Sequence, residues 1–244
     1  MLTNPLLGSH GLSDVAEHQM RTWALQMEAQ RRRSEQAATA SPEQLFHPCV
    51  TISRETGVDA AEIADLVAAE RHWKVLDRGI IEYMAEKYHW SPSDLESLDE
   101  RPASWFHEGF IKWLDSRLVT QQEFVSRLGK IVLMAAQHET TVFIGRGARF
   151  ILPRDRALAV RIIAPKKMRI QRIIERRQCT QREAEKFIDE MDEGRANFAK
   201  RYFHCDVADA TLYDLVINLE FTSREAAANL ILSDYNLRFG AEFQ

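Results

Sequence analysis

The chain has 244 residues, which is enough for one sizeable hydrophobic core and a small additional segment. Hydrophobic residues make up 45% of it and charged residues 28%, values that are ordinary for a soluble globular protein. The net charge of -4 excludes a global basic field of the kind that attracts nucleic acids, so any recognition of phosphate must be local.

The three cysteines, Cys49, Cys179 and Cys205, lie far apart and show no C-x-x-C spacing. This argues against a disulfide framework or a cysteine metal site and favours a reducing cytoplasm. Residues 1–12 have neither the basic n-region nor the apolar h-region of a signal peptide. The longest apolar stretches, such as residues 131–136, are too short to span a membrane. We therefore expect a cytoplasmic protein without membrane or nucleic-acid partners.

The N-terminal segment, residues 1–47, is expected to precede the main domain. Residues 1–12 predict a loose tail, and residues 13–36 have spaced apolar side chains in a polar background, which predicts an amphipathic helix. Arginines at positions 31–33 cluster near its end, where cations suit the helix dipole, although an anionic partner is the alternative. A role for this helix in packing or in a homodimer stays open.

Five short apolar or β-branched segments predict strands, and helical spacing occurs between them. The predicted strands are residues 49–53, 74–77, 141–145, 157–164 and 212–219. The clearest predicted helices are residues 60–70, 120–138 and 165–177. Two capping boxes, Thr180-x-x-Glu183 and Thr222-x-x-Glu225, predict the starts of two more helices. Strands that alternate with helices predict a parallel sheet with helices on both faces.

The turn after the first predicted strand is the first candidate for a binding site. It runs from Ser53 to Glu62 and leads into a predicted helix. Ligands of open α/β sheets bind at the carboxyl ends of the strands, and the free N–H groups of a helix N-terminus favour phosphate. A full P-loop reads G-x-x-x-x-G-K-[ST], whereas this turn has one glycine and lacks the lysine and the hydroxyl. Taken alone, the motif favours an ordinary βα loop and leaves a phosphate site open.

Several segments, in chain order, match the pattern of one known family. Ile52-Ser53-Arg54-Glu55, then Gly57 and residues 62–64, are similar to its I-S-R-E/Q-x-G-S-G-G-x-E-I-A opening. Its later segments are matched by residues 75–78, 143–148, 160–177, 192–198 and 213–218. The chain therefore resembles the cytidylate kinase-like family over about residues 48–235.

This resemblance implies an α/β, three-layer P-loop kinase-like fold, with a five-stranded parallel sheet and helices on both faces. It implies one domain over residues 48–238, with a helical acceptor-binding insertion over about residues 78–138 and a lid over about residues 176–200. The implied activity is that of a nucleoside monophosphate kinase-like transferase. Such an enzyme moves a phosphoryl group from ATP, bound with Mg²⁺, to a small acceptor such as CMP or dCMP.

The resemblance also implies three groups of site residues. The donor phosphates are expected at Ser53, Arg54, Gly57, Val58, Asp59, Ala60, Ala61 and Glu62. The acceptor is expected at Asp77, Arg78, Gly145 and Arg146. The residues expected to act in catalysis are Arg176, Arg195, Lys200 and Arg201. Arginines suit these roles because phosphoryl transfer depends on positioned cations, and no metal site built by side chains alone is expected.

Alternatives to these roles remain. Arg195 could pair with Asp192 in the preceding turn, and Arg176 could be an ordinary surface charge. Residues 58–60 read Val-Asp-Ala where the family has S-G-G, and a carboxylate at Asp59 would repel a triphosphate. The second hypothesis is therefore a catalytically degenerate family member that binds a nucleotide or a protein partner without turnover.

Overall fold

The computed structural model describes residues 46–77, 79 and 119–240, with the backbone alone described for residues 119–127. The chain divides into two compact units. One contains Met1–Thr3, Pro48–Arg78 and Glu139–Gln244, and the other contains Asn4–His47 and Gly79–His138. The predicted N-terminal helix, Arg78 and most of the predicted acceptor-binding insertion lie outside the described residues.

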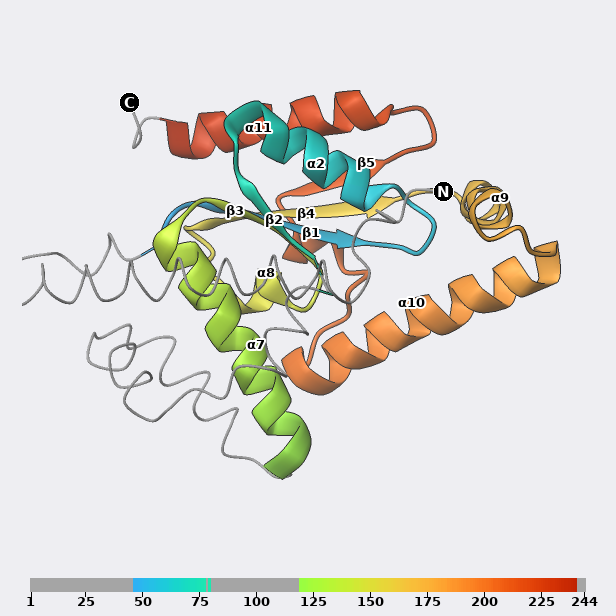
Figure 1. The fold of residues 1–244 in the computed structure, drawn as a ribbon, viewed down its shortest axis with the longest axis horizontal. Coiled ribbons are helices and arrows are strands. Elements are labelled where there is room, and N and C mark those ends of the chain that lie inside the picture. Colours follow the sequence, from blue (N-terminus) through green and yellow to red (C-terminus); the bar gives the residue numbers. More distant parts are fainter. Residues whose placement is uncertain (1–45, 78, 80–118, 241–244) are drawn as a thin grey trace, which may run out of the picture. The chain divides into compact units, whose positions relative to one another are not determined.

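The first unit is built on a sheet of five parallel strands (Figure 1). They are β1 (Cys49–Arg54), β2 (Lys74–Leu76), β3 (Thr141–Ile144), β4 (Ala157–Ile163) and β5 (Leu215–Asn218). They hydrogen-bond in the order β2-β3-β1-β4-β5, so β1 lies at the centre. The predicted parallel sheet is confirmed. Its fifth strand begins later than expected because Ala210–Leu212 form a short 3₁₀ helix, η3.

Helices of this unit follow β1, β3, β4 and β5. They are α2 (Ala60–Arg71), α8 (Ala148–Ile151), α9 (Lys166–Arg177), α10 (Gln181–Phe203) and α11 (Arg224–Phe239). The predicted capping box at the start of α10 is confirmed, since Thr180 and Glu183 each accept a hydrogen bond from the other's backbone N–H. The predicted cap of α11 is wrong by one residue. Ser223, rather than Thr222, accepts the N–H of Ala226, because the helix begins one residue later.

One face of the sheet packs against α2 and α11 and forms the main core. Alternate residues of β1, Val50 and Ile52, share a buried cluster with Ile63 and Val67 of α2 and with Ile231 of α11. The strong apolar character of these strands follows from this burial, because parallel strands covered on both faces carry few polar residues. In Figure 1, α2 and α11 lie together on this side of the sheet and α8 lies on the other.

The opposite face of the sheet carries polar residues near the carboxyl ends of the strands. Side chains alternate between the two faces of a strand, so Thr51 and Ser53 lie on the face opposite to Ile52. Ser53 lies opposite Arg161 in the register of β1 with β4. Arg161 is therefore a charged residue in the middle of an otherwise apolar strand, on the same face as Ser53.

Helices α9 and α10 form a hairpin with a small core of its own. Ile173 of α9 and Ala184 and Ile188 of α10 are buried against one another. The guanidinium carbon of Arg177 lies 4.1 Å from the centre of the Phe187 ring, which adds a cation–π contact. This hairpin covers residues 166–203 and so includes the segment predicted to be a lid.

In the second unit the described helix is α7 (Val119–His138), which confirms the helix predicted over residues 120–138. Near its end, the carbonyl of Ala136 accepts the N–H of His47 at 2.7 Å. Among the residues that the structure describes, no helix combines the length and the apolar character that crossing a membrane requires.

Candidate functional site

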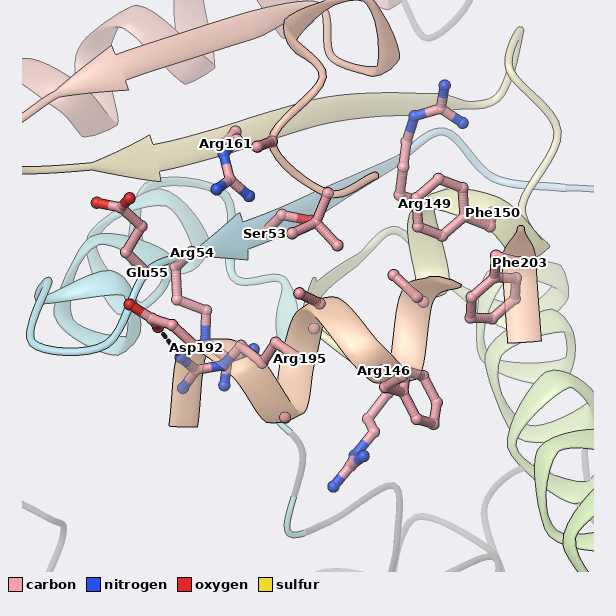
Figure 2. A pocket seen from close by; sticks show the side chains of 18 of the residues that line it. Ser53, Arg54, Glu55, Arg146, Arg149, Phe150, Arg161, Asp192, Arg195 and Phe203 are labelled. Carbon is pink, nitrogen blue, oxygen red and sulfur yellow. Dashed lines mark hydrogen bonds and ion pairs between the residues drawn. The ribbon is translucent and has the colours of Figure 1, made fainter. Parts of the chain in front are cut away.

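A cavity of about 550 Å³, here called the strand-end cavity, lies at the carboxyl ends of β1 and β3 (Figure 2). Helix α10 forms one of its walls, and Phe150, Phe198 and Phe203 supply aromatic surface. Charged side chains also line the cavity, and more of them are arginines than carboxylates. They are Arg54, Arg146, Arg149, Arg161 and Arg195, with Glu55, Asp192, Glu193 and Asp206. A cavity of this size and charge suits a small anionic molecule.

The β1–α2 loop is tied to α9 and α10 by a buried polar network. Thr56 donates its N–H at 2.8 Å and its hydroxyl at 2.7 Å to one carboxylate oxygen of Asp192. Arg169, which is 7% exposed, donates to the other oxygen at 2.7 Å and to the carbonyl of Thr56 at 3.2 Å. Its Nε also lies 3.3 Å from the carboxylate of Glu55. Two carboxylates therefore neutralise this buried arginine.

The single glycine of the loop permits this close packing. Gly57 has φ +85°, and a Cβ at this position would lie 2.9 Å from the carbonyl oxygen of Arg169. A side chain here would be disfavoured both by the backbone conformation and by the space available. Gly57, predicted as part of the donor site, thus lets the loop lie directly against α9.

Asp59, predicted to face the donor phosphates, is surrounded by arginines. It stands at the N-cap of α2 without capping it. Its carboxylate forms an ion pair with Arg176, and nitrogens of Arg224 and Arg172 lie 3.5 and 3.9 Å away. The repulsion of a triphosphate expected from Asp59 alone is therefore offset by positive charge at the same place.

A second cavity of about 570 Å³, here called the α2-end cavity, adjoins Asp59. Phe221, whose exposed fraction is 93%, lines it together with three arginines and four carboxylates, which are Arg172, Arg176, Arg224, Asp59, Glu175, Glu220 and Glu225. No side chain caps the first turn of α2, so the N–H groups there can donate hydrogen bonds to an anion. Arginines beside an uncapped helix N-terminus are a favourable arrangement for phosphate.

The four residues predicted to act in catalysis do not all lie together. Arg195 lines the strand-end cavity, donates to Asp192 at 2.8 Å and also donates to the hydroxyl of Thr56. The ion pair considered as an alternative role is therefore present, and it holds Arg195 beside the β1–α2 loop. Figure 2 shows Arg54 directed toward this pair.

The other three lie elsewhere. Arg176 lines the α2-end cavity and contacts Glu62 at 3.1 Å in addition to its pairing with Asp59. Lys200 and Arg201 are exposed on α10 and line neither of the two cavities. The guanidinium carbon of Arg201 lies 5.6 Å from the ring centre of Tyr202.

The turn after β3 brings two of the predicted acceptor residues to the strand-end cavity. Gly145, Arg146 and Gly147 have φ values of +78°, +53° and +72°. A Cβ at Gly145 would lie 2.0 Å from a guanidinium nitrogen of Arg54, so the glycine leaves room for that side chain. The guanidinium carbon of Arg146 lies 5.4 Å from the ring centre of Phe198. The predicted acceptor residue Asp77 is exposed after β2 and does not line this cavity.

Arg161 is a site residue that the sequence interpretation missed. It is 9% exposed, and Figure 2 shows its side chain pointing into the strand-end cavity. Its guanidinium carbon lies 5.7 Å from the ring centre of Tyr213. Among the described residues it makes no hydrogen bond or ion pair. A lone arginine inside the apolar run 157–163 was the signal in the sequence.

Arg149 differs from its neighbours in the cavity wall. Figure 2 shows its side chain directed away from Arg54 and Arg195. Its Nε donates to the carbonyl of Leu212. Burial, followed by the nearby positive charge of Arg154, lowers the pKa of Arg149. We infer that Arg149 holds the approach to η3 in place and contributes little to ligand binding.

Metal binding by side chains has little support in this part of the chain. The residues described contain no group of three or more His, Cys, Asp or Glu side chains that could hold a metal ion. The carboxylates near the loop, those of Glu55, Asp59 and Asp192, are already paired with arginines.

Comparisons with known proteins agree with this architecture. The sequence profile of the cytidylate kinase-like family matches residues 49–220. The crystal structure of an uncharacterized protein from Eubacterium ventriosum ATCC 27560 is similar, with a TM-score of 0.63 and 20% identity over 78% of this chain and 99% of that one. At this identity the similarity concerns the fold alone.

Two kinases of known structure are more distant. A shikimate kinase from Bacteroides thetaiotaomicron has a TM-score of 0.42 and 14% identity over 78% of this chain and 97% of its own. A gluconokinase from Sinorhizobium meliloti 1021 has a TM-score of 0.42 and 11% identity over 80% and 98%. No curated protein has a matching sequence.

Proposed function

This chain belongs to the cytidylate kinase-like family, and we propose on that basis that it transfers a phosphoryl group from ATP, bound with Mg²⁺, to a small acceptor such as CMP or dCMP. The observation that carries the proposal is the pair of cavities that adjoin the β1–α2 loop, each of which has arginines in its wall beside carboxylates. We assign this activity to a domain over residues 48–238, in which the α9–α10 hairpin is the lid.

The donor occupies the α2-end cavity. Its phosphates approach the uncapped N-terminus of α2, and the exposed ring of Phe221 offers a surface for the base. Arg176 and Arg224 now pair with Asp59 and Glu62. On binding, these arginines exchange part of this pairing for the stronger charge of the phosphates.

The acceptor occupies the strand-end cavity. Arg54 and Arg195 lie on the side of this cavity that meets the β1–α2 loop, where a transferred phosphoryl group would arrive. Their role is to hold the reacting groups in line and to neutralise the charge that spreads over the phosphoryl oxygens in the transition state. Arg146 helps to bind the acceptor from the β3 turn.

A second candidate function is binding without turnover, and one observation favours it. The N–H of Thr56 is bonded to Asp192, and Gly57 lies against Arg169. Groups that could wrap a phosphate are thus satisfied by the protein itself. For transfer to occur, the α9–α10 hairpin must release this loop.

The test is acceptor-dependent formation of ADP by the full-length chain, with Mg²⁺-ATP and with CMP, dCMP and other nucleoside monophosphates as acceptors. Arg195→Met is expected to lower the rate by about 100-fold or more, since it removes one preorganised cation. Arg71→Met, an exposed charge change at the end of α2 and outside both cavities, is the matched control. Saturable ATP binding without ADP formation from any acceptor would favour the second function, and absence of both would reject the proposal.

A further inference from the structure

Among the described residues of the first unit, two arginines are buried, and their surroundings differ sharply. Arg169 is 7% exposed and Arg161 is 9% exposed. Arg169 has two carboxylates and two backbone carbonyls as partners. Arg161 has only the face of Tyr213 among the described residues. One buried cation is therefore fully compensated, and the other is not.

An uncompensated buried cation is unfavourable, because burial removes the water that would otherwise solvate it. The guanidinium of Arg161 is not enclosed by apolar side chains alone, since it lines an open cavity of about 550 Å³. Its strand neighbour Ser53 lies opposite it in the register and lines the same cavity. A planar cation beside a hydroxyl is a suitable arrangement for the oxygens of an anion.

Arg161 also stands apart from the arginines proposed to act on the transferred group. Figure 2 shows Arg54 directed toward Arg195 and Asp192, whereas Arg161 extends from β4, where it lies opposite Ser53. In a simple nucleoside monophosphate, the one phosphate is itself the accepting group. A ligand whose accepting group meets Arg54 and Arg195 needs a second anionic group to pair with Arg161.

We propose that Arg161 and Ser53 form an anion subsite that holds a fixed phosphate or carboxylate of the acceptor, separate from the group that receives the phosphoryl. The substrate class is then a small molecule with a permanent anionic anchor and a distinct accepting group, and such a molecule takes the place of CMP or dCMP as the acceptor. The identification of the ligand as an acceptor rests on the proposed function. The subsite itself requires no phosphoryl transfer.

The experiment is calorimetric titration of the full-length chain, without nucleotide, with inorganic phosphate and separately with acetate. The wild type is expected to bind at least one of these anions saturably. Arg161→Gln should weaken that binding at least tenfold, Arg161→Lys less because it keeps the charge, and Ser53→Ala a few-fold. Arg71→Gln, an exposed control outside both cavities, should bind as the wild type does. Binding of phosphate alone would indicate a phosphorylated acceptor, and binding of acetate alone a carboxylate-bearing one.

Two results would overturn the subsite. One is a folded wild type that binds neither anion, and the other is equal binding by Arg161→Gln and the wild type. Thermal unfolding of each variant establishes that it is folded, and Arg161→Lys carries the comparison if the glutamine variant does not fold. Because ATP is absent, the outcome is independent of whether the chain transfers phosphoryl groups.

Discussion

The contrast between the two buried arginines gives a quantitative prediction about stability. Arg169→Met removes the buried cation of Glu55 and the donor of two backbone carbonyls, whereas Asp192 keeps Arg195 as a partner. Removing one partner of a buried ion pair costs about 3–5 kcal/mol of stability. For a chain of this size, each kcal/mol of lost stability lowers the midpoint of thermal unfolding by about 2–4 °C, so the expected decrease is about 6–20 °C.

Arg161→Met is the same substitution, arginine to methionine, at a position that is nearly as buried. It leaves no carboxylate unpaired, because Arg161 has none among the described residues. The lost contact with Tyr213 costs about 0.5–1 kcal/mol, and removal of an unsatisfied buried charge offsets it. We therefore expect the stability of this variant to lie within about 1 kcal/mol of the wild type, or above it.

The measurement is thermal unfolding of the wild type and of both variants, followed by circular dichroism at the same pH and ionic strength. The midpoint of thermal unfolding is expected to be far lower for Arg169→Met than for the wild type and Arg161→Met. A loss at Arg161→Met as large as that at Arg169→Met would refute the reasoning. It would mean that a structural role explains why Arg161 is buried, without any bound ligand.

Three further predictions follow from individual residues. Gly145→Ala should destabilise the chain by about 1–2 kcal/mol and displace Arg54, because Gly145 has φ +78° and the new Cβ falls 2.0 Å from Nη1 of Arg54. At least a tenfold loss of any phosphoryl transfer is expected, and unchanged turnover would contradict the packing described. Thr180→Ala should cost about 1 kcal/mol at neutral pH. Hydrogen bonds from Thr180 lower the pKa of Glu183, so this stabilisation is present above pH 4.5 and is lost as the pH falls through the lower, folded-state pKa. The difference in thermal unfolding between wild type and variant should therefore shrink in acid without vanishing, because the variant keeps the backbone N–H of residue 180 and lacks the hydroxyl that accepts the Glu183 N–H at every pH; a difference that grows in acid would count against the capping box. Burial raises the pKa of Cys49 to about 12, so iodoacetamide at pH 8 should leave it unlabelled in the folded chain, as read by peptide mass spectrometry, and rapid labelling would show that β1 is not buried.

The sheet could be predicted from the sequence because its signals are local. Continuous apolar runs such as residues 157–163 mark buried parallel strands, and the Thr180 capping box marks a helix start through contacts three residues apart. The shift of the α11 cap from Thr222 to Ser223 shows the limit of such signals. Two adjacent hydroxyl residues fit the same pattern, and packing decides between them.

The site was only partly predictable because its charges are paired over long sequence distances. Arg176 and Asp59 are 117 residues apart, and Thr56 and Asp192 are 136 apart. Nothing in the local pattern shows that Asp59 has three arginines around it, so its charge was expected to act alone. Arg161 was missed for the related reason that a sequence shows a buried arginine without showing whether a carboxylate faces it.

Calorimetric titration of the full-length chain with Mg²⁺-ATP tests the proposed phosphotransferase most directly. The arrangement of arginines at the α2-end cavity predicts saturable binding at one site, with a dissociation constant in the micromolar to low millimolar range. A folded chain that binds no ATP would contradict it. The tie between Thr56, Asp192 and Arg169 would then be a permanent closure of the loop, and the strand-end cavity would serve a ligand other than a phosphoryl acceptor.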